Sequence, residues 1–197
     1  MKHLMLAAAF ATGATAAMAD AVEYELDASH SQVVFSYDHL GFSTTTGMFS
    51  GFEGTIMFDE DAPENSSVTV SMPVMSMFTG WEAREAHLMS GDFFGAEEGD
   101  MVTFTSTSIE VTGENTANIT GDLTMNDVTK SVVLAATLNQ RAPFPFGPKQ
   151  GTDTLGLDAT TTLVRSDFNL GAFAPAVSDE VEVTISLEAW EASGDGS

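Results

Sequence analysis

The chain has 197 residues, no cysteine and a formal net charge of -23, with 29 acidic residues against six lysine and arginine residues. That acidity argues against binding to nucleic acid and against electrostatic docking to anionic membranes, because phosphate groups repel such a surface. Without cysteine there are no disulfides and no thiol chemistry, and the length suits one domain that needs no cross-links.

The first 19 residues predict a cleaved secretory signal peptide. Lys2 provides a basic start, and the apolar stretch 4–17 is shorter than the roughly 20 residues that a transmembrane helix needs. Residues 17–19 read Ala-Met-Ala, the small-x-small pattern that a signal peptidase needs. We therefore expect cleavage between Ala19 and Asp20, export to the periplasm, and no stable membrane insertion.

The remaining chain alternates apolar and polar residues at period two, which is typical of half-buried strands. In chain order the expected strands lie at 22–26, 33–37, 48–58, 68–74, 102–104, 119–125, 132–138, 155–163 and 181–187. Turn-forming residues separate them, including the proline-containing segment 59–66, the short connection 113–115, and Asn126-Asp127, which suits a tight hairpin. This pattern predicts one all-β domain at 20–190, a closed barrel or a sandwich, followed by a hydrophilic tail at 191–197.

One helix is expected among the strands, from Trp81 to Ser90. Thr79 and Glu82 have the spacing of a capping box for its start, and Gly91 can end it. A single helix between strands often covers a barrel mouth, so we expect it near one. A membrane barrel would alternate in the same way, but the hydrophilic tail and the lack of two clear aromatic girdles favour a soluble barrel.

The sequence contains no recognisable catalytic motif. The histidines after residue 19, His30, His39 and His87, lack the paired spacing of zinc sites; they could meet in space, but separate hydrogen bonds are the commoner outcome. There is no G-x-S-x-G nucleophile, and the acidic residues are too many to single out a catalytic pair. We therefore predict a binding protein with no metal and no cofactor, rather than an enzyme.

A series of short motifs runs in order through the chain: Asp27-Ala28-Ser29-His30-Ser31, His39-Leu40-Gly41, Gly47-Met48-Phe49-Ser50-Gly51-Phe52-Glu53-Gly54, Thr79-Gly80, Arg84, His87-Leu88, Asp92-Phe93-Phe94, Val102-Thr103-Phe104, Gly121-Asp122-Leu123-Thr124, Arg165-Ser166-Asp167-Phe168 and Val177-Ser178-Asp179-Glu180-Val181. Together they resemble the YceI-like family of periplasmic polyisoprenoid-binding proteins. Ala28, Asp100 and Ser131 stand where the family pattern has proline, and Asp127 and Asn169 where it has glycine, so the departures concern local turns.

The resemblance implies a lipocalin-like, eight-stranded antiparallel barrel with a long internal pocket. It implies a long apolar ligand, such as a polyisoprenoid, an isoprenoid quinone or a fatty amide, and it makes a homodimer plausible. The residues alone leave the interior open, because an eight-stranded barrel either fills with its own side chains or holds one small ligand.

Two sets of residues are candidates for a ligand site. The apolar lining would come from Phe35, Tyr37, Phe49, Phe52, Phe58, Met72, Met75, Phe78, Trp81 and Leu88, although each would equally serve as ordinary core packing. Polar partners for a headgroup at the mouth would come from His30, Arg84, His87 and Arg165, and the alternative for the two arginines is an ion pair with one of the many acids. Three functions stay open: a lipid carrier, an enzyme acting on a lipid headgroup through a histidine, and a stress-induced protein with a filled barrel.

Overall fold

The computed structural model describes residues 21–193. The expected signal peptide, its cleavage site between Ala19 and Asp20, and the end of the expected tail lie outside the described residues. Within the described range, no helix is long and apolar enough to cross a membrane.

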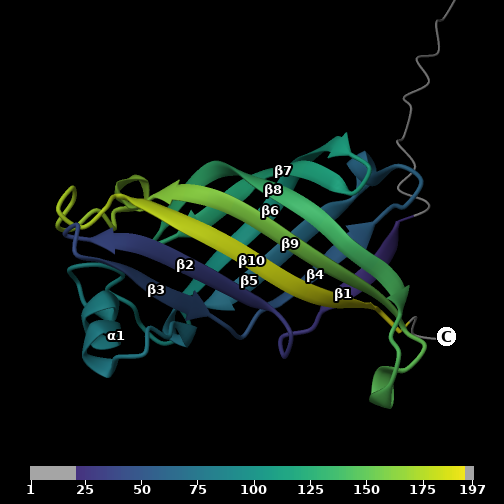
Figure 1. The fold of residues 1–197 in the computed structure, drawn as a ribbon, viewed down its shortest axis with the longest axis horizontal. Coiled ribbons are helices and arrows are strands. Elements are labelled where there is room, and N and C mark those ends of the chain that lie inside the picture. Colours follow the sequence, from purple (N-terminus) through teal and green to yellow (C-terminus); the bar gives the residue numbers. More distant parts are fainter. Residues whose placement is uncertain (1–20, 194–197) are drawn as a thin grey trace, which may run out of the picture.

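Strands make up most of the described chain (Figure 1). They are β1 (Val22–Leu26), β2 (Gln32–His39), β3 (Ser43–Phe49), β4 (Glu53–Phe58), β5 (Ser67–Pro73), β6 (Met101–Gly113), β7 (Thr116–Met125), β8 (Val128–Pro143), β9 (Asp153–Val164) and β10 (Glu180–Glu191). One α-helix, α1 (Glu82–Met89), and four short 3-10 helices complete residues 21–193: η1 (Pro63–Asn65), η2 (Val74–Ser76), η3 (Gly147–Lys149) and η4 (Arg165–Phe168).

The strands close into an eight-stranded antiparallel barrel, as expected. Each strand pairs with its neighbour in the order β1-β4-β5-β6-β7-β8-β9-β10-β2-β3, and a further β1–β10 pairing closes the ring. Along one edge of β10, residues 182–186 pair with 32–36 of β2, and residues 189–191 pair with 24–26 of β1. β1 and β2 are therefore two halves of one broken strand, and β3 and β4, which pair with β2 and β1, are the halves of the next.

The β7–β8 connection confirms the expected tight hairpin. Met125 pairs with Val128, which leaves Asn126 and Asp127 as a two-residue loop. Both have a positive φ, 51° and 60°, as a type I′ turn requires. Asp127 thus adopts the left-handed conformation without being glycine, and Asn169, with φ 59°, does the same after η4.

The helix begins one residue later than expected and is capped differently. Trp81 is the N-cap residue and makes no side-chain capping bond, and the last helical residue is followed by Ser90 at the C-cap. The expected Thr79–Glu82 capping pair is wrong, because the backbone N–H of Thr79 donates to Glu85 Oε1 at 2.7 Å. That hydrogen bond holds the pKa of Glu85 below its usual value. The carboxylate that accepts a hydrogen bond from Thr79 is therefore that of Glu85, about one helical turn after the expected Glu82.

Because the barrel is a meander, its connections alternate between two ends. The end that carries the β2–β3, β5–β6, β7–β8 and β9–β10 connections, with α1 in the β5–β6 connection, is called the open end. The end that carries the β4–β5, β6–β7 and β8–β9 connections is called the closed end. In Figure 1 the open end lies at the left, beside α1, and the closed end lies at the right, near the C-terminus.

A packed apolar cluster fills the barrel at the closed end. Tyr24, Leu155 and Ala189 have no exposed surface, and Ile56 is 4% exposed. The ring of Phe58 packs edge-on to the Tyr24 ring, with centroids 6.4 Å apart. Fully burying one such large side chain contributes about 1.5–3 kcal/mol, so this cluster stabilises the closed end of the barrel.

A polar network at the same end begins at the hydroxyl group of Tyr24. The Tyr24 hydroxyl donates to Asp153 Oδ2 at 2.8 Å, and Arg141 Nε donates to the same oxygen at 2.7 Å. Arg141, on β8, also pairs with Glu60 in the connection between β4 and β5. Burial, together with the bond to Asp153, raises the pKa of Tyr24 to about 12. Burial alone would raise the pKa of Asp153, but the hydrogen bonds from Tyr24 and Arg141 outweigh it and lower that pKa.

Candidate functional site

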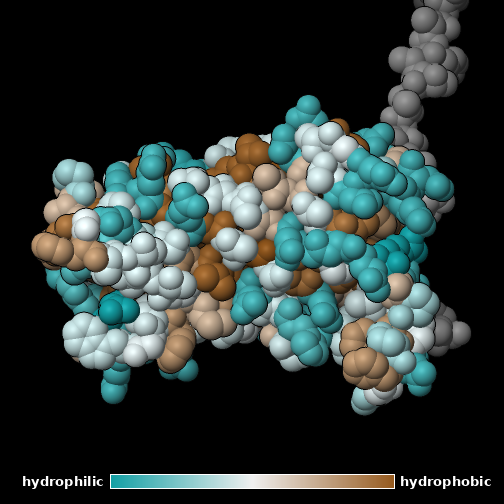
Figure 2. Space-filling view, viewed as in Figure 1, coloured by the Kyte–Doolittle hydropathy of each residue, from teal (hydrophilic) through white to brown (hydrophobic). Residues whose placement is uncertain are grey.

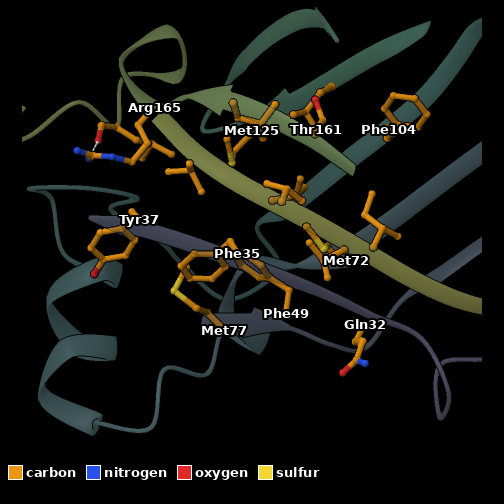
Figure 3. A pocket seen from close by; sticks show the side chains of 18 of the residues that line it. Gln32, Phe35, Tyr37, Phe49, Met72, Met77, Phe104, Met125, Thr161 and Arg165 are labelled. Carbon is orange, nitrogen blue, oxygen red and sulfur yellow. Dashed lines mark hydrogen bonds between the residues drawn. The ribbon is translucent and has the colours of Figure 1, made fainter. Parts of the chain in front are cut away.

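The rest of the barrel interior is a cavity of about 670 Å³. Its walls come from alternate residues of the strands, such as Val33, Phe35 and Tyr37 on β2 and Val181 and Val183 on β10. Figure 3 shows side chains from several strands gathered around this one space. The volume falls within the roughly 300–1,000 Å³ range of small-molecule sites.

Most of the expected apolar residues line this cavity. They are Phe35, Tyr37, Phe49, Phe52, Met72, Trp81 and Leu88. Phe35 packs against Phe49, with ring centroids 5.6 Å apart, and stacks on Tyr37 at 6.5 Å. These aromatic rings therefore pack on one another along the wall and also face the cavity.

The other three apolar candidates do not line the cavity. Phe58 belongs to the packed cluster at the closed end. Met75 and Phe78 are 57% and 59% exposed, because the strand alternation ends at Pro73 and a 3-10 turn follows. Phe78 pairs with Met48 of β3 through two backbone hydrogen bonds, of 2.8 and 2.9 Å, and the neighbouring Met77 is the residue that lines the cavity.

Part of the lining was missing from the candidate set. It includes Leu163 on β9, Val181, Val183 and Ile185 on β10, Leu123 and Met125 on β7, and Phe104 on β6. The alternation had already placed most of these residues on one face of a strand. What was missing was the knowledge of which face turns inward, because period two marks two faces without ranking them.

Two glycines make room for aromatic rings against the barrel wall. A Cβ added at Gly47 would lie 2.3 Å from Cζ of Phe35, the residue that pairs with it across the β2–β3 ladder. A Cβ added at Gly121 would lie 2.3 Å from Cζ of Phe104. Each ring therefore lies against backbone, where any other residue would push it away from the wall and toward the lumen.

Arg165, a candidate for the polar mouth, lines the cavity but is occupied by the backbone. Its Nε donates to the carbonyl of Ser178 at 2.9 Å, and Nη2 donates to that of Val177 at 3.1 Å. Nη1 donates to the carbonyls of Leu170 and Ala172. Burial lowers the pKa of this guanidinium. Arg165 therefore holds the β9–β10 connection in place, and neither of the two roles foreseen for it, headgroup contact or acid pairing, describes these bonds.

Arg84 and His87 lie one turn apart on α1, and both line the cavity. Arg84 donates one bond to the carbonyl of Thr79, at 3.2 Å, and its guanidinium carbon lies 5.5 Å from the centroid of the Trp81 ring. His87 Nε2 lies 3.0 Å from Asp92 Oδ2. Arg84 keeps donor groups beyond its single hydrogen bond, so it can still receive a polar group at the mouth.

His30 lies away from the cavity, so its expected place at the mouth is wrong. It belongs to the break between β1 and β2, where Nδ1 lies 2.6 Å from Asp27 Oδ2 and 3.9 Å from Glu188 Oε2. The hydrogen bond with Asp27 raises the pKa of His30. In the described chain, these three residues form the one group whose possible metal-ligand atoms all lie within 4.8 Å of one another. His39, by contrast, lines the cavity.

A family model, several relatives and several solved structures match this chain. The model of the YceI-like domain matches residues 24–189. A UPF0312 protein of Ectopseudomonas mendocina is 36% identical over 190 residues, which cover 95% of this chain and 97% of the relative. The crystal structure of BcnA from Burkholderia cenocepacia superposes with a TM-score of 0.73 at 25% identity, covering 83% of this chain and 98% of BcnA.

A polyisoprenoid binding domain from Saccharophagus degradans has the same fold, with a TM-score of 0.66 at 15% identity over 87% of this chain and 99% of that domain. The family match spans the strands from β1 to β10, and therefore both the packed closed end and the cavity. The resemblance that the sequence motifs indicated is confirmed. This chain belongs to the YceI-like family.

Proposed function

We propose that the protein holds one long apolar lipid, of the isoprenoid type, inside its barrel. The observation that carries this proposal is the cavity of about 670 Å³, whose walls are mostly valine, leucine, phenylalanine and methionine side chains. Apolar walls bind an alkyl chain by removing it from water, and thioethers adapt to its irregular shape. The Saccharophagus neighbour, named as a polyisoprenoid binding domain, supports the same ligand class.

The lipid enters the barrel tail first, through the open end. The packing of the closed end supports this direction. Tyr24, Leu155 and Ala189 have no exposed surface there, so the interior at that end is occupied by packed side chains. A chain entering from the open end would leave its polar head beside α1, where Arg84 and His87 line the cavity. An anionic head would gain a charge-assisted hydrogen bond from Arg84.

The carrier acts in the periplasm and releases its lipid unchanged. The basic start, apolar stretch and Ala-Met-Ala site of residues 1–19 support export. Mature protein isolated from a Gram-negative host is expected to begin at Asp20, and amino-terminal sequencing that found Met1 would contradict the location.

Mass spectrometry tests the ligand. Protein purified without detergent is denatured and extracted, and we expect one long-chain lipid per chain, with the same mass before and after incubation. Absence of lipid, together with failure to take up a labelled prenol, would contradict the carrier, and a change in lipid mass would indicate an enzyme.

A matched pair of variants on β9 links that lipid to the cavity. Ala159 lines the cavity, whereas Thr160 is exposed on the outer face. Ala159→Phe is expected to lower lipid content at least about tenfold, because the ring occupies the lumen. Thr160→Phe adds the same ring outside and should leave lipid content unchanged. Equal lipid content in both variants would place the lipid elsewhere.

A second pair separates the two arginines. Arg84→Gln is expected to weaken binding of an anionic prenyl phosphate by about tenfold relative to the neutral prenol, because one charge-assisted bond is lost. Arg165→Gln should instead lower the unfolding midpoint and leave that preference as it is, since its donors serve backbone carbonyls. The reverse result would exchange the roles assigned here.

A further inference from the structure

Several large apolar side chains at the open end of the barrel face water. Leu40, Trp81 and Phe173 all line the cavity, yet they are 47%, 61% and 57% exposed. Phe42, two residues beyond Leu40, is 88% exposed. These four residues are called the apolar rim. An exposed apolar group of this kind typically marks an interaction surface.

Three separate connections at the open end supply the apolar rim, and contacts join these connections to one another. The backbone N–H of Leu40, in the β2–β3 turn, donates to the carbonyl of Ala176 in the β9–β10 connection at 3.0 Å. In that connection, the ring of Phe173 lies 6.1 Å from the His87 ring of α1. Figure 2 shows apolar residues at the left-hand tip of the molecule, where the β9–β10 connection lies.

The closed end differs in what it exposes. It carries the Glu60–Arg141–Asp153 network. Among its described residues, Phe146 is a large apolar side chain that is 68% exposed and lies away from the cavity. Exposed apolar surface that continues into the cavity therefore belongs to the open end. A long alkyl chain that left a membrane through water would expose its whole length, and a rim continuous with the cavity removes that exposure.

The charge of the chain decides which surface the apolar rim can meet. With a formal net charge of -23, the protein is repelled by anionic headgroups, so attraction has to come from apolar insertion alone. We propose that the apolar rim inserts into the surface of a bilayer with neutral, zwitterionic headgroups, and that the lipid slides from that bilayer into the cavity. The proposal rests on the proposed function for its cargo, but the docking itself is measured separately.

Vesicle flotation with the full mature chain tests the docking. Phosphatidylcholine vesicles are expected to carry the protein, and phosphatidylglycerol vesicles to carry less of it at low salt. Phe42→Ser removes the most exposed rim side chain, which does not line the cavity, and should weaken vesicle binding about tenfold. The matched control is Phe146→Ser, which removes a comparably exposed phenylalanine from the closed end and should bind vesicles as the unchanged protein does.

Two further measurements complete the test. Phe42→Trp should shift its fluorescence emission to the blue when phosphatidylcholine vesicles are added, and Phe146→Trp should show no added shift. Labelled prenol offered in detergent micelles should load Phe42→Ser as well as the unchanged protein, while loading from vesicles slows. Equal vesicle binding by both serine variants would overturn the docking, as would a Phe42-dependent dimer in sedimentation without vesicle binding. Failure of loading from micelles in the unchanged protein would instead overturn the proposed function.

Discussion

The closed end and the hollow part of the barrel are built from the same strands but differ in what meets at the centre. Leu155 and Leu163 both point inward from β9, eight residues apart. Leu155 has no exposed surface and packs among Tyr24, Ile56 and Ala189. Leu163 is half-buried, packs on a wall cluster and faces the cavity.

The difference separates two tasks within one wall. At the closed end, side chains from opposite strands touch, so apolar burial stabilises the fold. In the hollow part, side chains pack along the wall but not across it, so apolar surface stays available to a ligand. Apolar surface without a protein neighbour across the barrel therefore lies where the ligand is proposed to bind.

Leucine truncation at the two positions should give the largest contrast. Leu155→Ala is expected to lower the free energy of unfolding by about 2–5 kcal/mol, because a cavity opens in a packed cluster. Leu163→Ala should cost less in the lipid-free protein, since its side chain already borders empty space. Urea unfolding of both lipid-free variants measures the difference. Equal losses would mean that the hollow part is packed as tightly as the closed end.

Gly47→Ala should disturb side-chain packing in the hollow part and leave the packing of the closed end unchanged. The added methyl group would lie 2.3 Å from the Phe35 ring, which has to leave the wall and enter the lumen. We expect a stability loss of about 1–3 kcal/mol from overpacking, together with reduced lipid content. Denaturant unfolding and mass spectrometry of bound lipid record the two effects.

The control for Gly47→Ala is Gly156→Ala. A Cβ at Gly156 would have its nearest neighbour at 4.0 Å, the carbonyl oxygen of Gln140, so space is available. This variant should change lipid content little. If it lowered lipid content as much as Gly47→Ala does, the Phe35 ring would not be the cause.

Tyr24→Phe should give the smallest effect at neutral pH, about 1 kcal/mol for the lost hydrogen bond to Asp153. The substitution should also change how the free energy of unfolding depends on pH in the alkaline range. The pKa of Tyr24 is raised to about 12 in the fold, against about 10 when unfolded. Its contribution is therefore complete below pH 10 and is lost as the pH rises toward 12.

Urea unfolding at pH 7 and pH 11 tests that dependence. The unchanged protein should lose more stability between the two values than Tyr24→Phe, which has no hydroxyl to ionise there. Tyr37, the other tyrosine, is present in both proteins and cancels from the comparison. Identical losses would show that the hydroxyl of Tyr24 is not held neutral by the closed end.

Strand positions could be predicted because alternation and turn residues are local signals. The misses have equally local reasons. The first part of β3 escaped notice because Ser43-Thr44-Thr45-Thr46 contains no apolar residue, although Thr45 is buried. The strand expected at 102–104 in fact extends to Gly113. Its later residues were not expected to be part of it because they are mostly polar and largely exposed. The expected strand at 48–58 is broken after Phe49, where β3 gives way to β4.

Site residues were predicted less well, because a residue's role depends on which others reach it. Phe58 and Phe35 have the same chemistry, yet one packs on Tyr24 in the closed end and the other lines the cavity. Arg165 looked free to bind a headgroup until the fold of the β9–β10 connection placed backbone carbonyls around it. Those carbonyls carry no signal in the residue letters.

The sequence by itself determined the alternation, the turns and the family, because each is written in spacing along the chain. Only the tertiary structure decided which end of the barrel is filled and which is hollow. Whether two inward side chains touch depends on the distance across the closed barrel, and that distance follows from strand pairing around the whole ring. Leu155 and Leu163 are both leucines on β9. The side chains that reach them from the other strands decide that Leu155 is packed and that Leu163 borders the cavity.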